Sequence, residues 1–233
     1  MFEKLLTQIK LSPEEIINQK VLTNQAFDEI KKFYQRIENR LNDPSFIQKR
    51  GHYAYDHVIT HSRQVAFYSV VVARAAGFTV KACCEMALAS ILHDLDKLYW
   101  PATLLDKPKN ELSRADWTRI MEHALASAIF VERLVKHQVS PMVITIIKQH
   151  HENLDGTGYP HNLTGKDIGP AARIIRITDS YESMTFLRPY KKRVLSHEES
   201  LNDLKNKTVR IYDPDIIKLL EQEFSAGKNE LGV

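Results

Sequence analysis

The sequence predicts an all-α protein, and three observations support that fold class. Apolar residues recur at helical spacing, helix-start signals precede these stretches, and no stretch shows a convincing strand pattern. One run, Met142 to Ile147, is rich in β-branched residues and would also fit a strand, but the preceding Ser140-Pro141 favours a helix. The start signals are Ser12-Pro13, Thr79, Ser113 with Asp116, Ser140-Pro141, Ser196 with Glu199, and Asp213-Pro214.

The chain divides into a short N-terminal segment, residues 1–48, and one domain, residues 49–233. Helix-spaced apolar residues continue to about Leu41, and the stretch from Asn42 to Ser45 then breaks the pattern. We expect the segment to be helical and to pack on the domain or on a second copy of the chain. A homodimer through these N-terminal helices is therefore a prediction.

The composition is that of a soluble globular protein, with 43% hydrophobic and 26% charged residues in 233. The sequence has no apolar run of 18 residues and no secretory signal, so we expect a cytoplasmic protein without a membrane partner. Its net charge of +3 comes from interspersed charges, which does not indicate a DNA-binding protein. The adjacent Cys83 and Cys84 lie in an apolar stretch and are expected to be core residues.

Histidines stand at spacings that allow them to share a metal site. His57 and His61 are four residues apart on a helix predicted from Asp56 to Ala76, so they project from one face. His93-Asp94 follows the apolar helix that begins after Thr79, where an unpaired charge would be costly. These groups need either partners or an ion.

The stretch from His150 to Pro160 is the densest group of ligand-type side chains, with two adjacent imidazoles, two carboxylates and two glycines. His123, on the helix opened by Ser113, would by itself more often be a core residue. Asp179 would equally well pair with Arg173 or Arg176 or bind metal. A basic run from Arg188 to Arg193 would, from composition alone, be a solvated turn.

Taken together, these groups predict a two-metal centre that activates water and clamps a phosphoryl group. The set exceeds what one tetrahedral ion uses, and imidazole mixed with carboxylate favours iron, manganese, nickel or zinc over a structural zinc site. The seven predicted ligands are His61, His93, Asp94, His123, His150, His151 and Asp179.

Five motifs in the same order resemble the HD-GYP subgroup of HD-domain metal-dependent phosphohydrolases. The likeness runs from about Tyr55 to Tyr190. The motifs are His61-Ser62, Leu92-His-Asp-Leu-Asp-Lys97, Met121-Glu-His123, His-His-Glu-x-x-Asp-Gly-x-Gly-Tyr-Pro at His150 to Pro160, and Asp179 to Tyr190.

The resemblance implies an HD-domain helical bundle and a phosphodiesterase that linearises cyclic di-GMP or a related cyclic dinucleotide. It implies that the seven ligands hold two divalent ions, iron or manganese first and nickel or zinc as alternatives, with Asp94 bridging. Lys97 matches a lysine near the scissile phosphate, and Arg188 and Lys191 match residues that hold the substrate's phosphates.

Two positions vary from the family pattern. Asp96 stands where the family usually has glycine and adds bulk and a negative charge near the expected phosphate. In some members a carboxylate four residues before the first histidine helps to hold a third metal. His57 stands at that position here, and Glu182 is a second candidate for a third ion.

Two other functions stay open at this point. One is an HD phosphohydrolase that acts on another nucleotide or phosphate ester. The other is a weakly active metal-binding module that serves in signalling with a protein partner, which Asp96 and the short N-terminal segment both motivate.

Overall fold

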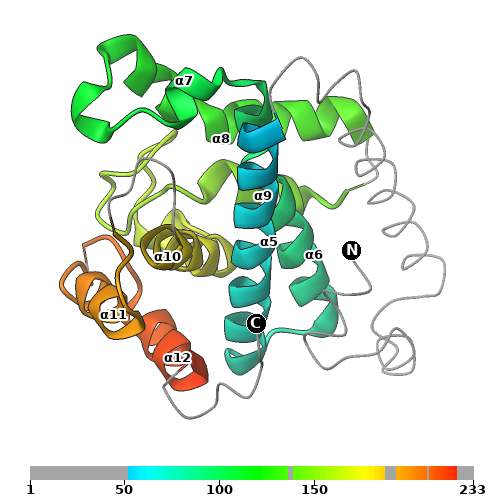
Figure 1. Cartoon of the computed structure of the whole chain (residues 1–233). Coiled ribbons are helices and arrows are strands. Elements are labelled where there is room, and N and C mark those ends of the chain that lie inside the picture. Colours follow the sequence, from blue (N-terminus) through cyan, green and yellow to red (C-terminus); the bar gives the residue numbers. More distant parts are fainter. Residues whose placement is uncertain (1–51, 136–138, 187–192, 209, 225–233) are drawn as a thin grey trace.

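The computed structural model describes residues 52–135, 139–186, 193–208 and 210–224, and within them the regular structure is helical (Figure 1). β-structure in these ranges is confined to two isolated bridges, Asp155 with Thr164 and Thr208 with Tyr212. The all-α prediction is therefore confirmed. The predicted N-terminal segment, residues 1–48, lies outside the described residues.

Helix α5 (His52–Ala75) runs through the middle of the fold, where α6 (Val80–Leu92), α10 (Pro170–Thr185) and α12 (Pro214–Phe224) pack against it (Figure 1). It begins four residues before the predicted start at Asp56. It ends as predicted, because Gly77 takes the left-handed conformation (φ +80°) that terminates the helix. Val65, Val72 and Ala73 of α5 are fully buried in this core.

Helices α8 (Arg114–Val135) and α9 (Pro141–Gln149) pack against each other, and α9 also contacts α6. The β-branched run of α9 is helical because Val143, Ile144, Ile146 and Ile147 are all buried. That spacing places them on one helical face, whereas a strand would alternate them between two faces.

Three of the predicted helix starts are confirmed by side-chain hydrogen bonds. Helix α9 begins at Pro141 as predicted, but Ser140 makes no capping hydrogen bond, and the start at Ser12-Pro13 lies outside the described residues. Thr79 accepts from the Ala82 amide at the start of α6. Ser113 and Asp116 form a reciprocal pair at α8, with N···O distances of 2.9 and 3.1 Å. The same capping box, Ser196 with Glu199, opens α11 (His197–Lys205).

The segment between α6 and α8, predicted as a polar loop after Pro101, contains more structure than expected. It holds the 3₁₀ helix η1 (Leu95–Tyr99), the one-turn α7 (Ala102–Leu105) and the 3₁₀ turn η2 (Lys109–Glu111). Leu95, Leu98 and Leu104 are buried, so apolar anchors hold the segment against the core. Short turns of this kind have too few residues for a periodic pattern to reveal them.

Within the described ranges, every helix is too short or too polar to cross a lipid bilayer. Cys83 and Cys84 are buried and unbridged, as predicted for core residues. Burial raises the pKa of the Cys83 thiol to about 11 and that of Cys84 to about 12.

Ile175 tests the packing of the site helix α10 on the core, since its side chain is fully buried. We expect Ile175→Ala to lower the free energy of unfolding by about 2–5 kcal/mol, through lost burial and the cavity it leaves. Val194→Ala, at an exposed position, should change it by less than about 0.5 kcal/mol. Urea denaturation of the two variants measures both values, and equal small effects would contradict the described packing.

Candidate metal centre

The predicted ligands come together where five helices meet. His61 lies on α5, His93-Asp94 directly follows α6, and His123 lies on α8. His150-His151 ends α9, and Asp179 lies on α10. Residues more than a hundred positions apart in the sequence thus reach one buried centre.

One group of potential ligands consists of His61, His93 and Asp94, whose ligand atoms lie within 4.8 Å of one another. Asp94 Oδ2 is 3.5 Å from Nε2 of His61 and 3.4 Å from Nε2 of His93. All three residues are buried. The two imidazoles therefore face the same carboxylate oxygen.

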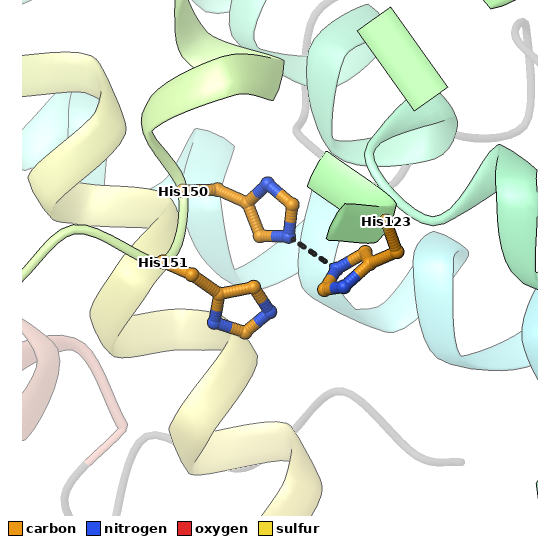
Figure 2. A group of neighbouring side chains, drawn as sticks. All are labelled: His123, His150 and His151. Carbon is orange, nitrogen blue, oxygen red and sulfur yellow. Dashed lines mark hydrogen bonds between the residues drawn. The ribbon is translucent and has the colours of Figure 1, made fainter. Parts of the chain in front are cut away.

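A second group consists of His123, His150 and His151, also within 4.8 Å (Figure 2). The three rings point toward one another, and Nε2 of His123 lies 3.2 Å from Nε2 of His150. Three imidazoles at this distance, without a carboxylate among them, match the nitrogen ligands of a transition-metal ion.

Asp94 and Asp179 lie between the two groups and reach both. The second oxygen of Asp94, Oδ1, is 3.2 Å from Nε2 of His123. Asp179 Oδ1 is 3.1 Å from Nε2 of His61, and its Oδ2 is 3.9 Å from Nε2 of His151. Each carboxylate thus presents one oxygen to each histidine group, which is the arrangement expected of bridging ligands.

The backbone orients three of the imidazoles in the same way. His93, His123 and His150 each donate from Nδ1 to the carbonyl three residues earlier, at 2.6, 2.5 and 2.7 Å. A carbonyl can only accept, so Nδ1 carries the proton and Nε2 keeps its lone pair for a metal. The acceptors are Ser90, Ile120 and Ile147.

Burial also favours the protonation states that a cation requires. It lowers the pKa of His93, and it lowers the pKa values of His150 and His151 well below the usual range, which favours their neutral forms. Burial alone would raise the pKa of Asp94, but His93 and Lys97 outweigh it and hold that pKa well below its usual range. For Asp179, His61 outweighs burial in the same way.

The site contains buried polar atoms that no protein group satisfies. His93 Nε2 has no hydrogen-bond partner although the residue is fully buried, and Asp94 Oδ1 accepts no hydrogen bond despite its proximity to His123. Leaving such atoms unpaired is costly. A lone pair on nitrogen and a carboxylate oxygen that face a shared centre fit a bound cation.

The alternative partners considered for Asp179 bind elsewhere. Arg173 pairs with Asp213 at 3.2 Å and donates to the carbonyl of Ile168. Arg176 donates to Asn153 and to Ser180. The surroundings of Asp179 are thus histidines, which favours the metal-ligand interpretation.

Glu182 reaches the site through another residue. Its Oε2 lies 2.5 Å from Nδ1 of His61, and it is almost fully buried. The carboxylate therefore turns Nε2 of His61 toward Asp94 and Asp179, as in the carboxylate–histidine pairs that support metal sites. His57, which is half-buried, is not in either ligand group, and a third ion at His57 or Glu182 stays a prediction.

Lys97 and Asp96 follow Asp94 on η1 and turn to different neighbours. Lys97 Nζ lies 2.8 Å from Asp94 Oδ2. The Asp96 carboxylate instead accepts from the indole N–H of Trp100 at 2.7 Å. The Asp96 carboxylate therefore already has one hydrogen-bond donor within the protein, the Trp100 indole.

The loop after His151 is held in place by Glu152, a residue that was not assigned a role from its sequence motif. Glu152 is buried and accepts from the amides of His161 and Leu163, at 2.7 and 2.9 Å. A side chain at Gly158 would collide with this turn, since its Cβ would lie 2.3 Å from the Asn153 nitrogen. The loop then places Tyr159 in a stack on His151, with ring centroids 4.8 Å apart.

A carboxylate directly after the paired histidines, before a Gly-rich loop, was the available signal for Glu152. The sequence could not show that it would bind the loop rather than the metal. Arg188 and Lys191, the predicted phosphate-binding residues, lie outside the described residues.

Comparisons with known proteins identify the family of the domain. The profile of the HD domain matches residues 52–216. The chain belongs to the HD-domain family. This confirms the family assignment made from the motifs.

Two curated relatives carry specific names. The chain is 33% identical over 133 residues to a 3′3′-cGAMP-specific phosphodiesterase of Vibrio cholerae, covering 56% of this chain and 28% of that protein. It is 32% identical over 165 residues to a cyclic di-GMP phosphodiesterase of Pseudomonas aeruginosa, covering 71% and 38%. The matched region thus spans less than half the length of either relative.

Two solved structures share the fold. One is a HDG"Y"P protein from Bdellovibrio bacteriovorus, with a TM-score of 0.61, 24% identity, and 72% of this chain and 53% of that chain covered. The other is the phosphodiesterase PgpH HD domain of L. monocytogenes, with a TM-score of 0.52, 15% identity, and 78% and 95% covered. At these identities the likeness supports the fold alone.

We expect Glu182→Gln to weaken metal binding by about 10-fold, because a neutral amide holds His61 less firmly than a carboxylate does. Equilibrium dialysis against Mn(II) measures the affinity. The matched control is Glu198→Gln on α11, an exposed residue, which should bind as the unaltered protein does. Equal affinities for both variants would contradict the orienting role of Glu182.

Proposed function

We propose that this chain is a metal-dependent phosphodiesterase that hydrolyses a cyclic dinucleotide, either cyclic di-GMP or 3′3′-cGAMP. According to their names, the two relatives described above act on these two substrates. Both substrates are phosphodiesters, and a two-metal centre suits in-line displacement at phosphorus.

The observation that carries the proposal is that Asp94 and Asp179 each face both histidine groups. Two cations in these groups would share both carboxylates, with Asp94 as the closer bridge. The proposed ligands are His61, His93, Asp94, His123, His150, His151 and Asp179.

When bound, two divalent cations lower the pKa of a water molecule and offset charge on the phosphoryl oxygens. We propose iron or manganese, with nickel or zinc as alternatives, because the donors are imidazole and carboxylate without thiolate.

The residues of the chain supply orientation and charge. Asp94 and Asp179 fix the spacing of the two groups, while the carbonyl-bound imidazoles keep their Nε2 atoms directed at the centre. Lys97 is partly exposed and near Asp94, so its ammonium is placed to donate to a phosphoryl oxygen as negative charge develops. Arg188 and Lys191 are proposed to hold the other phosphates of the substrate.

Turnover of defined substrates tests the proposal. Protein loaded anaerobically with Fe(II) or Mn(II) would be incubated with cyclic di-GMP, with 3′3′-cGAMP and with bis-p-nitrophenyl phosphate. We expect chromatography to show linear or mononucleotide products from a cyclic dinucleotide. Hydrolysis of the simple ester alone would support the broader phosphohydrolase, and no turnover by protein with two metals per chain would support the weakly active module.

The bridging role of Asp94 is tested by metal content. Asp94→Ala should lose activity and also retain fewer than two ions per chain by elemental analysis, because both groups lose a ligand at once. Asp203→Ala, on the surface of α11, should keep both ions. Retention of two ions by Asp94→Ala would contradict the assignment.

The predicted homodimer depends on residues 1–48, which lie outside the described residues. The homodimer and the signalling partner both stay predictions.

A further inference from the structure

Asp96 lies on η1 between the proposed ligand Asp94 and Lys97, and η1 is tied to α8 at this point. Its backbone N–H donates to Oγ of Ser127, a fully buried residue of α8, at 3.0 Å. Its side chain is half-buried and points to Trp100, one turn further along. The position of this carboxylate is therefore fixed from two sides.

Trp100 requires an acceptor for its indole N–H, because only 5% of the residue is exposed. Asp96 Oδ2 supplies that acceptor at 2.7 Å. A carboxylate accepts more strongly than a neutral group does. Glycine at position 96 would leave the indole without this partner.

The indole ring contacts both parts of the proposed site. It meets the ring of His123 edge to face, with centroids 6.0 Å apart and planes at 89°. Lys97 Nζ lies 6.0 Å from the indole centroid, at the outer limit of a cation–π contact. Trp100 therefore lies against one proposed metal ligand and against the lysine proposed to bind phosphate.

The geometry points to Asp96 as a positioning residue: through its hydrogen bond it holds Trp100 in place, and Trp100 in turn holds His123 and Lys97. The glycine usual in the family has thus been replaced by a residue with a partner of its own. The consequence for catalysis rests on the proposed function, whereas the consequence for metal binding does not.

A double-mutant cycle on Mn(II) affinity shows whether Asp96 acts through Trp100 or independently of it. Asp96→Gly should weaken binding by about 10-fold, the range found when residues supporting a metal ligand are removed. Asp96→Asn should stay within about threefold, because its amide oxygen still accepts from the indole. Trp100→Phe should weaken binding to a similar extent, and adding Asp96→Gly to it should have little further effect.

Asp106→Gly is the matched control, since Asp106 is also a half-buried aspartate of the segment between η1 and α8. It should bind Mn(II) as the unaltered protein does. Additive effects of Asp96→Gly and Trp100→Phe, or an unchanged affinity in Asp96→Gly, would overturn the inference.

Fluorescence reports on Trp100 without any substrate. The chain has two tryptophans, so Trp117→Phe leaves Trp100 as the only one, and Trp117 is partly exposed and outside the site. In this background, Co(II) should quench Trp100 emission. In the metal-free protein, Asp96→Gly should shift the emission maximum, whereas Asp96→Asn should keep the maximum of the unaltered residue. An unchanged spectrum in Asp96→Gly would contradict the proposed contact.

Kinetics at saturating Mn(II) then tests the part that rests on the proposed function. Asp96→Gly should lower kcat for the cyclic dinucleotide by about 10-fold, because Lys97 is less well placed in the transition state. If Asp96→Gly changes the Mn(II) affinity and the fluorescence but the unaltered protein shows no turnover, the proposed function is refuted and the positioning role of Asp96 is retained. Turnover that Asp96→Gly leaves unchanged would refute its catalytic consequence.

Discussion

Two buried carboxylates, Asp94 and Asp179, set the constraint on which the arrangement of the helices depends. Burial of ionised groups is costly unless the protein or an ion offsets their charge. Here the surrounding groups are histidines on or next to α5, α6, α8 and α9, so the packing of these helices determines which groups face the two carboxylates. The unpaired His93 Nε2 indicates that protein groups alone do not complete this balance.

The same local hydrogen bond orients several of the histidine rings around these carboxylates. His93 and His150 lie at the ends of α6 and α9, His123 lies within α8, and each uses the carbonyl three residues earlier to fix its ring. His61 uses the side chain of Glu182 instead. Three imidazoles are thus oriented by their own backbone, whereas His61 depends on the packing of α10 against α5.

Two kinds of feature could be predicted from the sequence: helix caps, which depend on neighbouring residues, and site residues that belong to a known motif. The caps at Thr79, Ser113 and Ser196 were predicted because each needs only neighbouring residues. The gathering of the histidines and of Asp94 at one centre was predicted because their motifs are specific, whereas their role as metal ligands stays a prediction. The roles of Glu152 and Glu182 were not predicted. A carboxylate near a metal site can bind the ion itself, or it can bind a loop amide or a ligand histidine, and the sequence does not distinguish these cases. The partner of Asp96 was also not predicted, because it depends on how a short 3₁₀ turn directs two side chains.

We propose that two cations share Asp94 and Asp179. Crystals grown with Mn(II) and measured for anomalous scattering locate such cations. We expect two peaks about 3.5–4 Å apart, the spacing of two-metal centres, one beside His61 and His93 and the other beside His123, His150 and His151. A single peak, or two peaks that do not share these carboxylates, would contradict it.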